Sequence, residues 1–268
     1  MKVDTSKFVF LNEGKDRIVG RPIELNRVTL ATHHNFAELL LFGDLHYGHP
    51  QCDEAKARDM LAWAKRENVY ILLMGDLIEV GLRESVGDSI YRQKLHPQEQ
   101  MEAVEAMFEP VKHLIIGLHR GNHETRIFRL TGIDISKLMA KHLGVRYLEY
   151  SCWSLLKVGN QHYSMYSTHG HSGARFKHTK LKAIVDLTGW ISADIVAMGH
   201  VHTIAAEPIM RQKIYHHQVV EEKNYVVLTG SYLRWNKTYA EDAGYPITRI
   251  GSPRAKLLAN EHDIHFRL

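Results

Sequence analysis

The chain of 268 residues can bury a large core, and its composition, 44% hydrophobic and 24% charged, is that of an ordinary globular protein. The formal net charge of +4 favours a polyanionic partner only weakly. No apolar run is long enough to span a membrane, and the charged N-terminus lacks a secretory signal, so we expect a cytoplasmic protein with no membrane partner. Cys52 and Cys152 imply no disulfide framework.

Short apolar runs alternate with amphipathic stretches along the chain. We expect strands over 39–42, 70–74, 114–118, 163–166 and 195–198, and helices over 53–67, 97–114, 134–143 and 176–187. Pro110 is expected to disturb the second helix, and Gly144 to cap the third. The pair Gly159-Asn160 predicts the turn of a hairpin. This alternation predicts an α/β fold in one domain over 1–268.

Two further kinds of segment stand outside this alternation. Residues 79–100 are polar and aperiodic, and we expect them to form a loop on the substrate side of the site. Residues 1–36 and the tail after about 235 carry no recognisable chemistry. We therefore place the core of the domain at about 37–235 and treat both ends as extensions.

Five clusters place potential metal ligands beside a glycine, and most of them follow an apolar run directly. They are Gly43-Asp44-Leu45-His46, Gly75-Asp76, Gly121-Asn122-His123-Glu124, Thr168-His169-Gly170-His171 and Gly199-His200-Val201-His202. Ligands of open α/β sheets bind at the carboxyl ends of strands, so we expect the fold to gather the clusters there. Carboxylate, carboxamide and imidazole groups are suitable ligands for divalent metals.

The spacing within two clusters suggests shared faces. Asp44 and His46 lie two residues apart, so on an extended strand end both side chains would reach one metal. His200 and His202 have the same spacing. The first pair alone is also explained by a turn aspartate with a solvent-facing histidine. A lone histidine at a strand end would be a structural group, but two histidines at this spacing favour a shared ligand.

The other clusters suggest distinct roles. Asp76 could bridge two cations because a carboxylate has two oxygens, although a helix-capping aspartate looks the same in sequence. With Asn122 as a neutral oxygen ligand, the adjacent His123 would point toward the substrate. An imidazole that titrates near neutrality suits a general acid there.

Taken together and in this order, the clusters resemble the pattern of the calcineurin-like metallophosphoesterase superfamily, which is D-x-H, GD, GNH(E/D), H and GHxH. The resemblance spans Asp44 to His202. It implies a four-layer α/β/β/α sandwich of two mixed sheets flanked by helices. It also implies two divalent metal ions, with Mn²⁺ first and Fe, Zn²⁺, Ni²⁺ or Mg²⁺ as alternatives.

The resemblance assigns roles residue by residue. It implies that His123 protonates the leaving oxygen or stabilises the transition state, and that Asp76 bridges the two ions. The first ion would be held by Asp44, His46 and His202, and the second by Asn122, His169 and His200. Two such cations roughly 3.5–4 Å apart would lower the pKa of a bridging water and clamp the attacking and leaving oxygens.

The branches of the superfamily differ in their phosphate contacts. The run from Arg120 to Glu124 resembles the protein Ser/Thr phosphatases, in which this arginine holds the phosphate during catalysis. The GDxHG and GDxVDRG motifs of that branch are incomplete here, and its second phosphate arginine is missing. The GHxH pair resembles the nuclease and phosphodiesterase branches, including Mre11/SbcD-like nucleases. We therefore expect a phosphodiesterase or nuclease acting on DNA or RNA.

Candidate substrate contacts flank the clusters. They are Arg120, Arg126, Tyr47, His49 and Tyr91. A basic stretch made of Arg175, Lys177, Lys180 and Lys182 would suit a groove that follows a nucleic-acid backbone, but such a run is more often a solvated helix face.

Three alternatives remain open. The chain could be a phosphomonoesterase or nucleotide hydrolase acting on small substrates. An inactive scaffold is disfavoured because the ligand set and His123 are all retained. A mononuclear zinc site in an unrelated α/β enzyme is disfavoured by Asn122, because zinc prefers nitrogen and sulfur donors.

Overall fold

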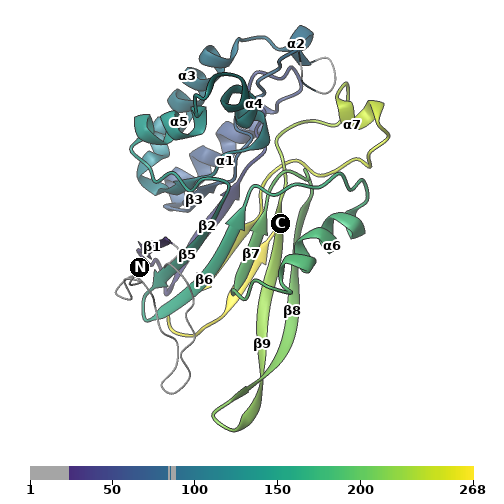
Figure 1. Cartoon of the computed structure of the whole chain (residues 1–268). Coiled ribbons are helices and arrows are strands. Elements are labelled where there is room, and N and C mark those ends of the chain that lie inside the picture. Colours follow the sequence, from purple (N-terminus) through teal and green to yellow (C-terminus); the bar gives the residue numbers. More distant parts are fainter. Residues whose placement is uncertain (1–23, 84, 86–88) are drawn as a thin grey trace, which may run out of the picture.

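The computed structural model describes residues 24–83, 85 and 89–268. These residues form four layers in the order helices, sheet, sheet, helix, which confirms the predicted α/β/β/α sandwich (Figure 1). Residues 1–23, 84 and 86–88, which include parts of the expected N-terminal extension and of the polar segment 79–100, lie outside the described residues.

One sheet has six strands in the order β1-β5-β6-β7-β9-β8. Its strands are β1 (Leu25–Leu30), β5 (Ser151–Val158), β6 (Gln161–Thr168), β7 (Ile195–Met198), β8 (Ile204–Tyr215) and β9 (Gln218–Thr229). The pairs β5–β6 and β8–β9 are antiparallel, whereas β1–β5, β6–β7 and β7–β9 are parallel. The predicted hairpin is confirmed, since β5 and β6 turn at Gly159-Asn160.

The other sheet has five strands in the order β11-β10-β2-β3-β4. Its strands are β2 (Phe36–Phe42), β3 (Tyr70–Leu73), β4 (Ile115–Leu118), β10 (Arg254–Leu258) and β11 (Ile264–Arg267). The strands β2, β3 and β4 are parallel, and β10 pairs antiparallel with both β2 and β11. The C-terminal tail thus completes this sheet, and β1 extends the other.

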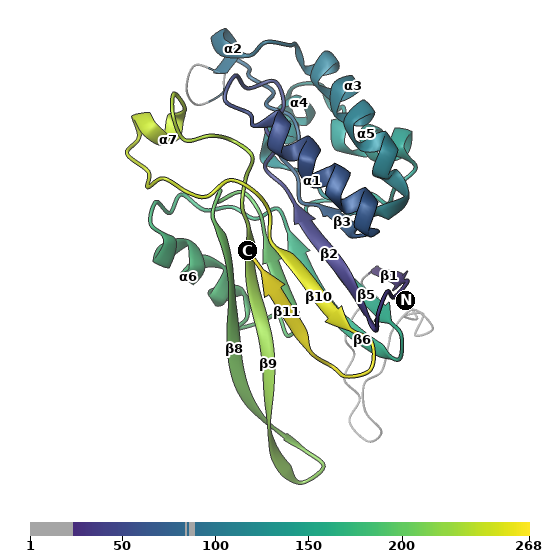
Figure 2. The same ribbon diagram turned by 180° about the vertical axis from the view of Figure 1, so that it is seen from behind.

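Helices lie on the outer sides of both sheets, whereas β10 and β11 have no helix of the described chain over the face seen in Figure 2. Those beside the five-stranded sheet are α1 (Glu54–Glu67), α3 (Pro97–Phe108), the 3-10 helix η2 (Glu109–Leu114), α4 (Asn122–Thr131) and α5 (Ile135–Leu143). Helix α6 (Lys177–Leu187) covers the six-stranded sheet, and α2 (Ser89–Arg92) and α7 (Tyr239–Asp242) are short. Among the described residues, no helix combines the length and apolar character needed to cross a membrane.

The helix ends follow the sequence signals. Asp53 caps α1 by accepting a hydrogen bond from the backbone of Lys56, and Gly144 ends α5 in a left-handed conformation. The α-helix from Pro97 gives way after Phe108 to the 3-10 helix that contains Pro110, as predicted, because proline cannot donate to the helical ladder. Helix α4, which begins within the Gly-Asn-His-Glu cluster, was not among the predicted helices.

Three buried clusters lie between the four layers. Beside α3, the rings of Phe42 and Phe108 pack at right angles to each other, and Phe42 stacks on Tyr232. Between the sheets, leucines from β2 and β3 are buried with Tyr163 and Met165 from β6. The third cluster joins α6 to the outer face of β7 and β9. Burial on both faces explains the nearly continuous apolar runs of the central strands.

Candidate metal centre

All five clusters lie at the carboxyl ends of strands, as predicted. Asp44 follows β2, Asp76 follows β3 and the cluster containing Asn122 follows β4. In the other sheet, His169 comes directly after β6, and His200 follows β7. The chain therefore delivers ligand-type side chains from both sheets to one edge of the sandwich.

The backbone at these positions is left-handed rather than extended. The φ angles are 51° at Asp44, 53° at His46, 48° at Asp76, 68° at His200 and 50° at His202. The expectation that extended strand ends align the pairs is therefore wrong, and tight turns place the side chains instead. Residues other than glycine rarely adopt such φ angles, at a cost of roughly 1–2 kcal/mol each, and they cluster at functional sites.

The first group of facing side chains consists of Asp44, His46 and His202. Their ligand atoms lie within 4.8 Å of one another. The two Nε2 atoms of the imidazoles are 3.0 Å apart, and the Nε2 atom of His202 is 3.4 Å from Oδ1 of Asp44. This close approach of two ring nitrogens and a carboxylate is a suitable arrangement of donors for one cation.

The second group consists of Asp76, His169 and His200, with Asn122 beside them. Oδ2 of Asp76 lies 3.3 Å from Nε2 of His169. The carboxamide oxygen of Asn122 lies 2.9 Å from the same nitrogen and 2.7 Å from Nδ1 of His200. The other oxygen of Asp76 accepts a hydrogen bond from the backbone of His123, so Oδ2 is the oxygen that faces the ligand atoms.

The outer ring nitrogens support the metal-binding interpretation. Nδ1 of His46 lies 2.9 Å from the carboxylate of Glu79, and Nδ1 of His169 lies 2.8 Å from the carbonyl oxygen of Met74. An acceptor at Nδ1 keeps the proton there and leaves the Nε2 lone pair for a metal. The residues present therefore fit two divalent cations.

Glu79 was not singled out in the sequence, because it belongs to no cluster. Burial would raise the pKa of this carboxyl, but the hydrogen bond from His46 and the charge of His123 lower it to about 2. In turn, burial would lower the pKa of His46, but the hydrogen bond and charge of Glu79 raise it overall. Glu79, His46 and His123 form a third group with ligand atoms within 4.8 Å of one another.

Gly121 and Glu124 hold the turn around Asp76 together. The carboxylate of Glu124 accepts hydrogen bonds from the backbone nitrogens of Asp76, Leu77, Ile78 and Gly121. Burial, and then the charge of Asp76, raise the pKa of Glu124 to about 7. A Cβ atom at Gly121 would lie 2.1 Å from Oδ1 of Asp76, so only glycine permits this approach of the two turns.

His123 lies between the carboxylates and the pocket. Its Nδ1 donates to the main-chain oxygen of Glu79 at 2.5 Å, and its Nε2 accepts from Arg126 at 2.9 Å. Burial lowers the pKa of His123 to about 4, against the opposing charge of Asp76. The ring is thus held as a neutral imidazole whose Nε2 lies 3.9 Å from Oδ2 of Asp76.

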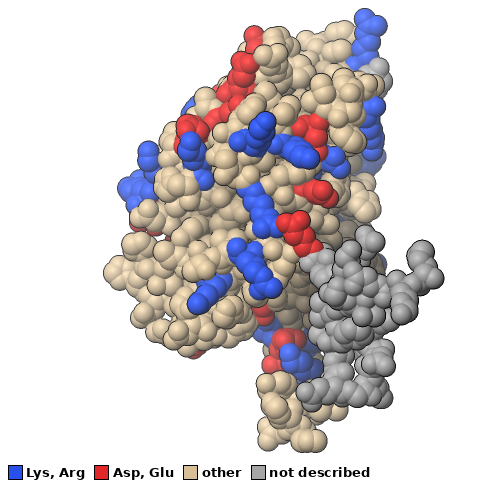
Figure 3. Space-filling view, turned by 60° about the vertical axis from the view of Figure 1, so that its left-hand side comes forward, with Lys and Arg blue, Asp and Glu red and all other residues tan. Residues whose placement is uncertain are grey.

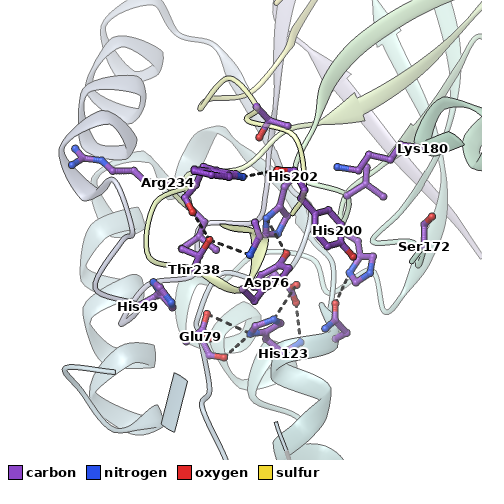
Figure 4. Close-up of a pocket in the computed structure, with 18 of the residues that line it drawn as sticks. His49, Asp76, Glu79, His123, Ser172, Lys180, His200, His202, Arg234 and Thr238 are labelled. Atoms are coloured by element: carbon purple, nitrogen blue, oxygen red, sulfur yellow. Dashed lines mark hydrogen bonds and ion pairs between the residues drawn. The ribbon is translucent and has the colours of Figure 1, made fainter. Parts of the chain in front are cut away.

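A cavity of about 550 Å³ opens beside these groups (Figure 4). One wall comes from the C-terminal tail, in which no chemistry was recognised; it includes Trp235, Thr238, Tyr239 and Tyr245. The hydroxyl of Tyr239 lies 3.4 Å from Nδ1 of His202. The tail therefore forms a wall of the cavity beside the first group of ligands.

The structure brings some of the expected substrate contacts to the cavity and not others. His49 and Arg126 line it. Arg120 does not: its guanidinium pairs with Asp134 at 3.3 Å and lies over the ring of Phe128. Tyr47 is buried in the core beneath α1 and α3, and Tyr91 on α2 is 86% exposed.

Comparisons with known proteins identify the family. The calcineurin-like phosphoesterase family matches residues 37–230, which is more than half of the chain. The chain therefore belongs to the calcineurin-like phosphoesterases. No curated protein matches it in sequence.

The chain is also similar to several solved structures. Yfce, a phosphoesterase from E. coli, is 16% identical, with 86% of this chain and 98% of that chain covered and a TM-score of 0.41. Vacuolar Protein Sorting 29 from Cryptosporidium parvum is 15% identical, with 87% and 97% covered and a TM-score of 0.43. Vps29 complexed with zinc from Entamoeba histolytica is 15% identical, with 86% and 97% covered and a TM-score of 0.34.

Proposed function

We propose that this calcineurin-like phosphoesterase is a dinuclear metal-dependent phosphodiesterase that acts on nucleic acid. The observation that carries the proposal is the pair of ligand groups at one edge of the sandwich, one built on Asp44 and the other on Asp76. Both groups contain two histidines, and both border the same cavity through His202 and His200.

The two groups would each hold one divalent cation. In this proposal Asp44, His46 and His202 bind the first, and Asn122, His169 and His200 the second, with Asp76 between them. When bound, the metals would supply an activated water and the positive charge that stabilises a pentavalent phosphorus. Mn²⁺ is our first candidate, because the donors mix carboxylate, carboxamide and imidazole groups.

His123 and Arg126 would act on the substrate side. The neutral His123 ring presents Nε2 toward Arg126, which also donates to the carbonyl oxygens of Glu79 and Val80. A proton that reaches Nε2 can pass to the leaving oxygen, and the guanidinium beside it can neutralise charge that develops there. Both roles require His123 to remain where Glu79 holds it.

A diester is favoured over a phosphoprotein or other monoester by the cations at the cavity. Arg120, the expected phosphate clamp of the phosphatase branch, is paired with Asp134 outside the cavity. Among the described residues, the Lys and Arg side chains that line the cavity are Arg126, Lys180 and Arg234. Arg126 donates to main-chain oxygens and Arg234 pairs with Asp53, which leaves Lys180 as the one without such a partner. A diester carries one negative charge fewer than a monoester dianion and so requires fewer cationic contacts.

A small phosphomonoester or nucleotide remains the second candidate, on two observations. The cavity volume of about 550 Å³ is typical of small-molecule sites. On the face that Figure 3 shows, Lys and Arg side chains lie among Asp and Glu side chains instead of forming one basic tract. A polynucleotide would gain little long-range attraction from this face of the molecule.

One comparative assay tests the proposal. Metal-stripped protein is reloaded with Mn²⁺ and given labelled single- and double-stranded DNA, RNA, and chromogenic monoester and diester substrates, with His123→Ala as the control. Cleavage of nucleic acid and diester that disappears in the control supports the proposal. Monoester turnover with intact nucleic acid supports the second candidate, and no turnover of any substrate refutes both.

A further inference from the structure

Lys180 differs from the other basic residues of the stretch that precedes and begins α6. Only 4% of its surface is exposed, whereas Arg175, Lys177 and Lys182 are exposed. Lys180 lines the cavity, and Figure 4 shows its Nζ atom pointing inward on the side of His200. Three of the four residues thus belong to a solvated surface, and the fourth belongs to the candidate site.

The ammonium group of Lys180 has few partners. It donates to Oγ1 of Thr203 at 3.0 Å, and the Thr203 hydroxyl in turn donates to the carbonyl oxygen of Val201. Its Nζ atom lies 5.7 Å from the ring centroid of Tyr245. No carboxylate among the described residues forms an ion pair with it, so two of its three N–H groups have no partner in these contacts.

The other cationic side chains at the cavity, Arg126 and Arg234, form hydrogen bonds or an ion pair within the protein. Arg126 donates to main-chain oxygens and to His123, and Arg234 pairs with the carboxylate of Asp53. Lys180 is therefore the cavity-lining Lys or Arg whose charge has no such partner within the described part of the chain.

A buried charge without a counter-charge is costly, so its presence requires an explanation. Burial lowers the pKa of Lys180, and no neighbouring carboxylate opposes that shift. An apolar residue at this position would remove the cost. An anionic ligand that enters the cavity would remove it as well, and would use the two remaining donors.

We propose that Lys180 binds a phosphate oxygen of the substrate. It would then provide the phosphate contact that Arg120 does not supply in this cavity. The inference rests on the proposed phosphoester chemistry but concerns recognition, not the reacting atoms. Lys180 is thus a residue that determines affinity for phosphate.

The test compares Lys180→Met with Lys182→Met, both in the metal-loaded protein. Lys182 lies on the same helix, and its side chain is 70% exposed and paired with Asp186. For Lys180→Met we expect KM for the best phosphoester substrate, and the dissociation constant of inorganic phosphate by calorimetry, to rise about tenfold or more. We expect kcat of Lys180→Met to fall by a smaller factor than that rise. In Lys182→Met, KM and the dissociation constant of phosphate should stay unchanged.

Thermal unfolding of the ligand-free variants separates recognition from a structural role. Because Lys180→Met removes a buried, unpaired charge, its melting temperature should equal or exceed that of the wild type. Unchanged phosphate affinity in Lys180→Met, with or without a lower melting temperature, overturns the inference. If the wild type hydrolyses no phosphoester, the proposed function fails, and the calorimetric comparison still decides whether Lys180 binds phosphate.

Discussion

Replacing Glu79 by Ala tests whether an outer partner of His46 controls metal binding. The carboxylate lies 2.9 Å from Nδ1 of His46 and thereby directs Nε2 toward the first ligand group. The main-chain oxygen of Glu79, which holds His123 and Arg126, is retained in the variant. The substitution therefore removes the acceptor that orients His46 and the carboxylate 3.6 Å from Nδ1 of His123, while the main-chain hydrogen bond from His123 remains.

The magnitude follows from the role of such partners. Loss of an outer hydrogen-bond acceptor typically weakens metal affinity about 10–100-fold, which is about 1.4–2.7 kcal/mol. One effect opposes this loss. Without Glu79 the pKa of His46 falls, so protons compete less with the metal for the His46 imidazole. Titrations at two pH values separate the effects, because proton competition weakens as pH rises. Glu79→Gln, which keeps an acceptor, should lose less affinity than Glu79→Ala.

The assay is a competition titration against a chromogenic chelator, with metal stoichiometry measured by elemental analysis. Glu105→Ala is the matched control, because Glu105 also accepts from a histidine, His142 at 2.8 Å, and neither residue belongs to a ligand cluster. Wild-type affinity in Glu79→Ala would refute the orienting role. Loss of one whole equivalent of metal in both Glu79→Ala and His123→Ala would instead make the group of Glu79, His46 and His123 the metal site.

Three further predictions address the site and its surroundings. His123→Ala should keep its metal content by elemental analysis while kcat falls about 10²–10⁴-fold; wild-type turnover would remove its catalytic role. Asp76→Ala should lose metal, and an unchanged metal content would remove Asp76 from the ligand set. Burial lowers the pKa of His119 to about 4, so the unfolded chain binds the proton first as pH falls below about 6.5. His119 should therefore make the wild type less stable as pH falls from 6.5 to 4, by about 3 kcal/mol in full, and His119→Gln should flatten this dependence in urea titrations.

The sequence predicts the layers and the ligand clusters because both depend on local patterns. The apolar runs of β2, β3, β4 and β7 are largely buried on two faces, so they are visible as nearly uninterrupted hydrophobic segments, whereas β6 alternates buried and partly buried residues. The ligands follow these strands directly, and glycines such as Gly121 mark where two turns approach each other. The order of the clusters along the chain then identifies the family.

The surroundings of the ligands could not be predicted, because they depend on distant parts of the chain. Glu79 meets His46 across 33 positions, and Tyr239 meets His202 across 37. The guanidinium of Arg120 pairs with Asp134, the residue that caps α5. This pair depends on how α5 packs beside the cluster that contains Arg120, which the sequence does not show. One signal was present for Lys180, which lies four residues before the buried Ile184 and so on the same face of α6.

The left-handed backbone at the candidate ligands also means that some substitutions that raise stability would lower activity. Five of the positions proposed to bind metal, from Asp44 to His202, have φ angles between 48° and 68°, which glycine adopts at far lower cost. A search for more thermostable variants would therefore tend to select glycine at these positions and would lose the site. These strained positions follow strands of both sheets. Substitutions at any of them could therefore stabilise the metal-free protein while abolishing its proposed activity.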